Sequence, residues 1–137
     1  MTKINQIFIN LPVKDLNKSI EFFTKVGFTF NAQFTDENAT CMIIGENMFA
    51  MLLTEKYFST FITKPIADAK KATEVITALS VSSRDEVESI IEKAFAAGGK
   101  QYKDPIDYGW MYNRNFEDLD GHQWEIFYMD MSAMPTE

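Results

Sequence analysis

Glu125 is the residue in this sequence with the clearest capacity for chemistry. It stands between Trp124 and Ile126 in a strand-like stretch, so the alternation of side chains predicts that both apolar neighbours face the core while the carboxylate faces the other way. A carboxylate in that position can serve as a general base, a metal ligand or a polar anchor for a bound molecule. We favour an anchor, or a structural relic, over a base.

Arg114 is the natural partner to consider for Glu125. A hairpin turn over Asp118–Gly121 would place Glu117 opposite His122, and the same register would place Arg114 opposite Glu125. Opposed Arg and Glu side chains would form an ion pair on one face of the sheet. The expected role of Arg114 is therefore that of a second anchor.

The other residues that often carry catalysis are scarce. The sole histidine, His122, follows the turn glycine Gly121 and lies three residues from Glu125, a spacing that puts the two on opposite faces of a strand. The sole cysteine, Cys41, lies in the middle of a strand-like stretch and reads as a small buried hydrophobe. The sequence offers no Ser-His-Asp or Cys-His arrangement and no glycine-rich phosphate loop, so it excludes the chemistries that depend on them.

The composition of the chain disfavours some classes of binding partner. The chain has 137 residues, 20 acidic against 13 basic side chains and a net charge of −7, which favours a single domain and disfavours nucleic acid as a partner. No apolar run approaches the ~20 residues of a membrane helix. With one cysteine and no signal-peptide pattern, we expect a cytoplasmic protein. The 12 Phe and 8 Met residues suit either an adaptable apolar cavity or an ordinary core.

The first half of the chain predicts a strand, a helix and three further strands. Ile4–Val13 alternates as a strand, Asp15 is a suitable N-cap for a helix that reaches Val26, and Gly27 ends that helix. The further strands are expected near 28–34, 39–44 and 48–53. A linker follows over 55–72, and its aromatic residues suggest a short amphipathic helix: Tyr57, Phe58 and Phe61.

The second half predicts the same order. A strand is expected over 74–81, and Ser83 with Glu86 forms a capping box ahead of a helix that reaches Ala97. The last three strands are expected near 100–103, 110–116 and 122–129. Phe8–Val13 precedes the first helix as Ile76–Val81 precedes the second, at one constant offset, which indicates an internal duplication.

The duplication predicts an α+β fold in which two βαβββ modules form a curved mixed sheet around a shared cleft. We expect one domain over 1–137, with module one at about 3–54, the linker at 55–72, module two at about 73–129 and a tail over 130–137. The residues expected to bind a ligand in the cleft are Phe8, Asn10, Trp110, Tyr112, Arg114, Phe116, Glu125 and Phe127. The alternative is that these side chains fill the cleft themselves.

Two stretches of the chain resemble a known superfamily. Leu11-Pro-Val-Lys-Asp-Leu-Asn-Lys-Ser-Ile-Glu-Phe-Phe, followed by Val26-Gly27-Phe28, resembles the opening of the vicinal oxygen chelate superfamily. Phe116-Glu-Asp-Leu-Asp-Gly-His-Gln-Trp-Glu is similar to its closing hairpin. This group contains glyoxalase I, bleomycin-resistance proteins, fosfomycin-resistance enzymes and extradiol dioxygenases. The resemblance spans about residues 3–129 and implies paired βαβββ modules, but one scaffold hosts many functions.

In the enzymes of that superfamily a divalent metal is held by residues from the first and last strands of the modules. Carried over to this chain, the first-strand positions are Phe8 and Ile76, and the position on the last strand is Glu125. The last strand of module one offers Phe49, Ala50 and Met51. Phe and Ile have no lone pair to donate, so Glu125 is the only retained candidate ligand and a bound divalent metal is disfavoured.

Taken together, the sequence predicts a glyoxalase/bleomycin-resistance-like protein that binds a small amphipathic or aromatic molecule in an apolar cleft without the usual metal or another cofactor. The first alternative is a glyoxalase-like lyase or isomerase that uses Glu125 as a base or as its sole retained metal ligand. The second alternative is a dimeric scaffold with a filled cleft. In each case we expect a homodimer with no nucleic-acid or membrane partner.

Overall fold

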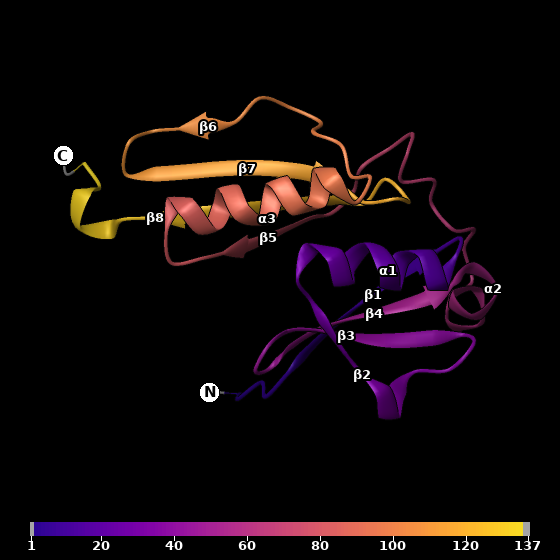
Figure 1. The fold of residues 1–137 in the computed structure, drawn as a ribbon. Coiled ribbons are helices and arrows are strands. Elements are labelled where there is room, and N and C mark those ends of the chain that lie inside the picture. The colour runs from indigo at the N-terminus through magenta and orange to yellow at the C-terminus, as the bar shows by residue number, and fades with distance from the viewer. Residues whose placement is uncertain (1, 136–137) are drawn as a thin grey trace. The chain divides into compact units, whose positions relative to one another are not determined.

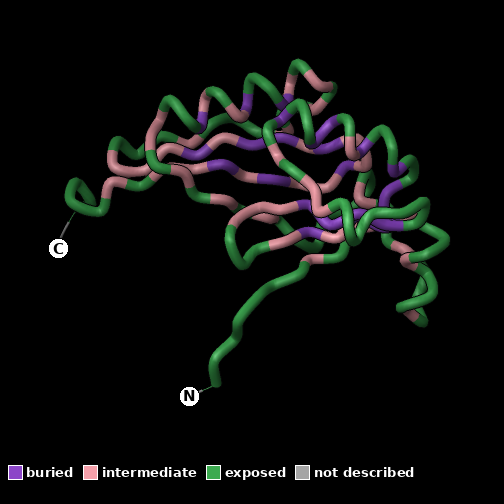
Figure 2. Tube along the Cα trace, turned by 60° about the horizontal axis from the view of Figure 1, so that its bottom comes forward, coloured by how far each residue is buried: buried purple, intermediate pink, exposed green. Residues whose placement is uncertain are grey.

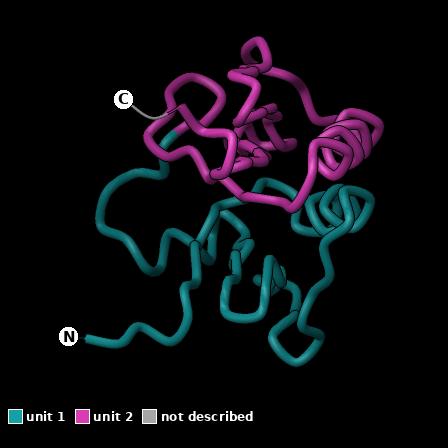
Figure 3. The backbone as a smooth tube through the Cα atoms, turned by 90° about the vertical axis from the view of Figure 1, so that its left-hand side faces the viewer, with its two compact units in different colours: residues 1–67 teal, residues 68–137 magenta. Residues whose placement is uncertain are grey.

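The computed structural model describes residues 2–135, which form two compact units, Met1–Ala67 and Asp68–Glu137 (Figure 3). The division falls inside the linker expected over 55–72. Residues 1, 136 and 137, which belong to the expected domain and tail, lie outside the described part of the chain. Among the described residues, no helix combines the length and hydropathy needed to cross a bilayer.

The first unit is a four-stranded mixed sheet with one long helix on one face (Figure 1). Its sheet order is β1-β4-β3-β2, in which β1 and β4 are parallel and the other pairs are antiparallel. In chain order the elements are β1 (Ile7–Val13), α1 (Leu16–Val26), β2 (Thr29–Asn31), η1 (Ala32–Phe34), β3 (Ala39–Gly45), β4 (Met48–Thr54), α2 (Glu55–Phe58) and η2 (Ser59–Phe61).

Local sequence signals account for α1. The Asp15 carboxylate accepts a hydrogen bond from the Lys18 amide at 3.1 Å, as an N-cap should. Gly27 ends the helix with φ at 122°, a conformation that side chains resist. The buried stripe includes Phe22, Phe23 and Val26. The bounds predicted for this helix are confirmed.

The second unit repeats the order of the first around its own sheet. The sheet order is β5-β8-β7-β6, again with one parallel pair, β5 and β8. The elements are β5 (Ile76–Ser80), α3 (Arg84–Ala96), β6 (Ile106–Asp107), β7 (Met111–Glu117), β8 (Gln123–Met129) and η3 (Met131–Ala133). The α+β fold of two βαβββ modules is therefore confirmed.

One expected strand did not form where the sequence suggested. In place of a strand over 100–103 there is a single bridge between Lys100 and Glu117, and the third-last strand forms later as β6. The cause is Asn115, whose side-chain oxygen accepts hydrogen bonds from the Tyr102 and Lys103 amides. The Tyr102 amide is the donor that the next pair of a ladder with β7 would need after the Lys100–Glu117 bridge. The first module's second strand is likewise short, because residues 32–34 turn into a 3-10 helix.

Each core lies between a sheet and its helix, and Figure 2 shows the buried residues along the strands and on one side of each helix. In the first unit the fully buried strand residues include Met42, Ala50 and Leu52, and in the second unit Phe116, Trp124 and Ile126. We call the sheet face that turns away from the helix the open face. By the strand registers, the open face of the second unit carries Ile76, Ala78, Ser80, Met111, Asn113, Asn115, Glu117, Gln123, Glu125, Phe127 and Met129.

Candidate functional site

The register of the β7–β8 hairpin decides which side chains can accompany Glu125. Glu117 lies opposite Gln123, which places Asn115, not Arg114, opposite Glu125. The predicted register is therefore wrong by one residue. The connection is longer than a four-residue turn, because the Asp118 amide donates to the His122 carbonyl at 3.0 Å and closes a loop that includes both residues. A shift of one residue sends every side chain of a strand to the other face.

Arg114 consequently lies on the α3 side of the sheet. Its guanidinium donates to the Glu88 carboxylate at 2.9 Å and to the Gln101 side-chain oxygen at 3.2 Å, and it stands 5.6 Å from the centroid of the Phe95 ring. The hydrogen bond from the Tyr112 hydroxyl lowers the pKa of Glu88, burial opposes this effect, and Arg114 lowers the pKa further. Arg114 therefore ties β7 to α3 and is not a ligand anchor beside Glu125.

Two of the predicted lining aromatics, Tyr112 and Phe116, lie on the opposite face of the sheet from Glu125. The Tyr112 hydroxyl donates to Glu88, which belongs to α3. Phe116 is fully buried and stacks on Trp124, with ring centroids 6.2 Å apart. Trp110 precedes β7 and stacks on Tyr108. The prediction that Tyr112 and Phe116 line one face with Glu125 follows from the wrong register and is wrong, whereas Trp110 lies outside the paired residues of β7 and its role as a ligand contact stays a prediction.

The position of Arg114 leads to a first prediction. Arg114→Met keeps an unbranched, largely apolar side chain of smaller size but removes the guanidinium and its charged hydrogen bonds to Glu88 and Gln101. We expect a loss of about 1–2 kcal/mol in the free energy of unfolding, measured by urea denaturation. Affinity for any ligand of the Glu125 face should change less than about twofold. Unchanged stability together with lost binding would restore Arg114 as an anchor.

Glu125 itself lies on the open face as predicted, and its carboxylate is held from two sides. The Asn113 side-chain amide donates to one carboxylate oxygen at 3.0 Å. The Lys103 ammonium lies 3.8 Å from the other oxygen, and the Glu125 side chain is 16% exposed. Phe127, the remaining predicted contact on β8, shares this face. The carboxylate is therefore fixed in orientation and still partly open to solvent.

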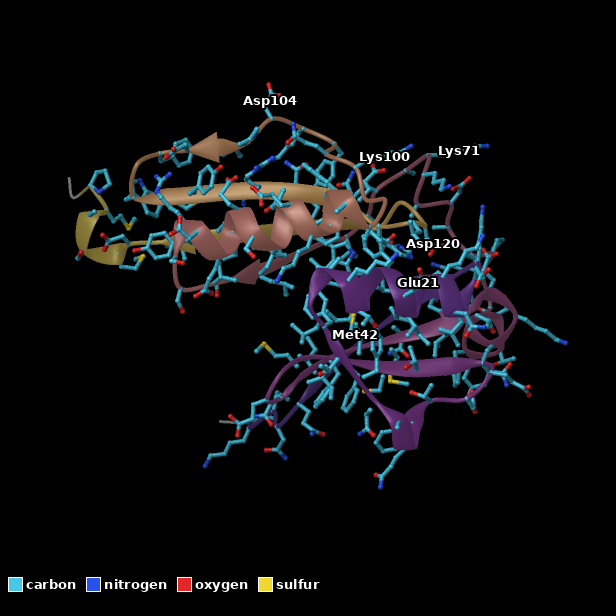
Figure 4. All side chains as sticks on the ribbon, viewed as in Figure 1. Glu21, Met42, Lys71, Lys100, Asp104 and Asp120 are labelled. Carbon is cyan, nitrogen blue, oxygen red and sulfur yellow. The ribbon has the colours of Figure 1, made fainter. Side chains whose placement is uncertain are left out.

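Asn115 positions the segment that runs over this part of the sheet. Besides accepting from the Tyr102 and Lys103 amides at 2.9 and 3.2 Å, its side chain donates to the Lys103 carbonyl at 2.9 Å. These three bonds bring Lys103 to Glu125, whereas Asp104 at the crest of the segment points outward (Figure 4). The sequence analysis missed both Asn113 and Asn115. Two asparagines spaced by two in a strand were the available signal, since Asn is depleted in strands.

Two buried polar atoms in this region have no hydrogen-bond partner among the described residues. They are the Asn113 side-chain oxygen and the Tyr102 hydroxyl. Burial, followed by the negative charges of Glu125 and Glu117, raises the pKa of Tyr102 to about 12. An unpaired buried polar atom costs free energy, so both atoms are expected to lower the stability of the fold.

Tyr102 supports a second prediction, on pH dependence. Because its pKa is about 12 in the folded chain against 10.0 ordinarily, the phenol binds its proton more tightly in the folded state. The contribution of this group to the free energy of unfolding is constant below pH 10. It is lost as the pH rises from 10 to 12, because the unfolded chain releases the proton at a lower pH than the folded chain. Tyr102→Phe should remove this extra loss and raise the free energy of unfolding at pH 7 by about 1 kcal/mol.

The measurement is urea denaturation at pH 7 and pH 11, with Tyr112→Phe as the matched control. The Tyr112 hydroxyl is bonded to Glu88, so its removal should lower stability at pH 7 by about 1 kcal/mol, the opposite sign. A destabilised Tyr102→Phe would mean that its hydroxyl has a partner in solution.

Comparisons with known proteins agree with this architecture. The sequence model of the Bleomycin resistance protein-like N-terminal family matches residues 6–45. Protein SA1046 of S. aureus, described as hypothetical, is 28% identical with a TM-score of 0.78, covering 93% of this chain and 95% of its own. A glyoxalase/bleomycin resistance protein/dioxygenase from Nocardioides is 24% identical with a TM-score of 0.73, covering 100% and 91%. The chain therefore has the glyoxalase/bleomycin resistance fold.

A further structural match is a glyoxalase-related enzyme from Fulvimarina pelagi, 20% identical with a TM-score of 0.76, covering 91% of this chain and 88% of its own. A comparison with curated proteins found no match. Likeness at these identities establishes the superfamily fold and leaves the activity open.

The residues at the metal positions that the resemblance implies do not fit a divalent metal ion. Phe8 stacks on Phe49 at 4.8 Å, and Phe8 and Ile76 are 47% and 48% exposed. The strand registers make Met51 the counterpart of Glu125, since Asn10 pairs with Met51 as Ala78 pairs with Glu125. Four positions that could hold a metal thus supply one carboxylate, a thioether and two hydrocarbons.

One cluster of potential ligand atoms lies in the β7–β8 turn. Atoms of Asp118, Asp120 and His122 lie within 4.8 Å of one another. The Asp118 carboxylate already accepts hydrogen bonds from the Asp120 amide, the His122 amide and the Trp124 indole N–H. The cluster does not include Glu125 and is explained by the turn it closes.

Proposed function

We propose that this chain binds a small amphipathic or aromatic molecule on the open face of its second unit, with Glu125 as the polar anchor. The apolar part of the ligand would lie on the side chains around the anchor. Ile76 is 48% exposed and Met129 is 41% exposed, and Phe127 shares their face. An apolar surface with few fixed polar groups is typical of small-molecule sites.

The observation that carries the proposal is the fixed, partly exposed carboxylate of Glu125. The Asn113 amide determines its orientation at 3.0 Å, and the Asn115-bound segment brings Lys103 near it. Asn113 orients this carboxylate among exposed apolar side chains, and the burial of the polar Asn113 and Asn115 side chains that this requires costs free energy. A binding role supplies the gain that a purely structural role does not.

We further propose that binding needs no divalent metal. Phe8, Ile76 and Met51 offer no hard or borderline donor, so Glu125 would have to hold an ion with water alone. Phe8 and Asn10, on the open face of the first unit, remain predicted ligand contacts, and the Phe8–Phe49 stack gives that face an aromatic surface. A homodimer in the cytoplasm also remains a prediction.

The test uses N-phenyl-1-naphthylamine, a neutral aromatic dye, and protein treated with EDTA. We expect saturable fluorescence enhancement that EDTA does not reduce and that Ile76→Asp weakens about tenfold, because a charge beside the apolar contact must be desolvated. Thr29→Asp, an exposed strand position in the first unit, is the control. Equal dye binding by parent and Ile76→Asp would contradict the proposed face, and stoichiometric Zn²⁺ binding lost in Glu125→Gln would contradict metal-free binding.

A second candidate function is a lyase or isomerase in which Glu125 is a base. Two groups favour this candidate. Glu125, the base, is held in orientation by Asn113. Tyr102, with its pKa at about 12, keeps its proton at neutral pH and can donate a hydrogen bond to the substrate. A base acting next to a carbonyl group exchanges the neighbouring proton with solvent. Deuterium exchange into a bound carbonyl compound, followed by NMR and lost in Glu125→Gln, would select this candidate.

A further inference from the structure

Asn113 presents a hydrogen-bond acceptor that the fold leaves unused. The residue is 8% exposed, and its amide nitrogen donates to Glu125 at 3.0 Å. A carboxylate only accepts, so the amide cannot be turned round, and its oxygen is the atom that does not contact Glu125. That oxygen is buried and has no partner among residues 2–135.

The charges around Asn113 favour a positively charged donor. Glu117 and Glu125 share the open face, and both act on the Tyr102 hydroxyl. Among residues 2–135, Lys103 is the cation whose ammonium lies within 4 Å of the Glu125 carboxylate; the distance of 3.8 Å is beyond hydrogen-bond range, and the Lys103 side chain is 45% exposed. Its ammonium is therefore a loosely held counter-ion that a better-placed donor can replace.

We propose that Asn113 and Glu125 together receive an N–H donor of the ligand, and that the donor is a protonated amine. The inference rests on the proposed binding function and adds the chemical class of the ligand's polar group. Because the Asn113 oxygen is buried in the free protein, binding requires a local displacement of the residues that cover it; the ammonium would then give one hydrogen to this oxygen and one to the Glu125 carboxylate while displacing Lys103. Asn113 is then the residue that determines specificity.

Other polar groups fit less well. A ligand carboxylate or sulfonate would meet the negative charge of Glu125 and the oxygen of Asn113, both of which repel it. A ketone or an ether has only lone pairs and would leave the Asn113 oxygen unpaired. A hydroxyl can donate one hydrogen bond but carries no charge, so it should bind between these extremes.

The experiment compares three naphthalene probes by fluorescence or calorimetric titration at pH 7: 1-naphthylmethylamine, 1-naphthalenemethanol and 1-(methoxymethyl)naphthalene. We expect the amine to bind about tenfold more tightly than the methyl ether, with the alcohol between them. Asn113→Leu and Glu125→Gln should each remove most of this preference while retaining binding of the ether.

Glu117→Gln is the control, because it removes a negative charge from the same face without touching the Asn113–Glu125 pair. It should preserve the preference for the amine within about twofold. A preference that falls equally in Glu117→Gln and Glu125→Gln would reduce the effect to general electrostatics and overturn the proposal. Equal binding of all three probes would overturn it while leaving the proposed function intact, whereas binding of none would overturn both. Circular dichroism and thermal melting verify that each variant is folded.

Discussion

Replacing Asp118 by alanine is expected to lower the free energy of unfolding by about 3 kcal/mol. Asp118 is 7% exposed, and its carboxylate accepts from the Trp124 indole N–H at 3.0 Å and from the backbone amides of Asp120 and His122 at 2.9 and 3.0 Å. Trp124 is fully buried, so its indole N–H would find no replacement partner. Burial raises the pKa of Asp118. Because the buried charge itself costs free energy, we expect a net loss smaller than the sum of three hydrogen bonds.

The measurement is urea or thermal denaturation, and Asp36→Ala is the matched control. Asp36 forms a similar turn between β2 and β3, with its carboxylate accepting from the Asn38 and Ala39 amides at 2.8 and 3.1 Å. Asp36 and Asn38 are exposed, so water can bond the Asn38 amide in place of the carboxylate, and the expected loss is about 1 kcal/mol. Equal losses in the two variants would contradict the role given to burial.

Asp118 also explains why the site, unlike the fold, could not be predicted in full. Elements with local signals were predicted well. Ser83 caps α3 by accepting from the Glu86 amide at 3.1 Å, although the Glu86 carboxylate reaches the Ser82 amide at 3.4 Å and not that of Ser83 itself. Such signals depend on residues three or four apart and are visible in sequence.

The β7–β8 register depends instead on a tertiary interaction. The bond from the Trp124 indole to Asp118 joins the strand to the loop, and it fixes a connection one residue different from the four-residue turn that Asp118–Gly121 suggests. Turn residues alone do not distinguish these lengths. The error of one residue left the strands correct but exchanged the faces of Arg114 and its neighbours.

The partners of Glu125 were missed for a related reason. Asn113 and Asn115 act through contacts with Glu125 and with the 102–103 backbone, each about 12 residues away along the chain. No local sequence pattern predicts contacts of this range. The resemblance to the superfamily points instead to the metal positions, which Phe8 and Ile76 occupy. What the sequence did establish was the face of Glu125, because alternation in β8 is a local property.

A second large effect on stability is expected at Gly121, in the same β7–β8 loop. Its φ is 89°, in the region that favours glycine. A β-carbon placed there would lie 2.9 Å from the Lys70 amide nitrogen and 3.0 Å from the Ala69 carbonyl carbon, which are backbone atoms that cannot rotate away. The Lys70 amide also donates to the Asp68 side chain at 3.0 Å, so displacement of this segment would strain a second turn.

We therefore expect Gly121→Ala to lower the free energy of unfolding by about 3 kcal/mol, of which about 1 kcal/mol is conformational and the rest arises from the collision. Gly109→Ala separates the two contributions. Its φ of 85° is nearly the same, but an added β-carbon meets nothing within 4 Å, so only the conformational cost of about 1 kcal/mol should appear in the same urea titration. If the two variants lose equal stability, the close approach of residues 69–70 to the hairpin is not maintained in solution. A larger loss at Gly121 means that this segment holds the loop in which Asp118 fixes the register, and with it the face on which Glu125 stands.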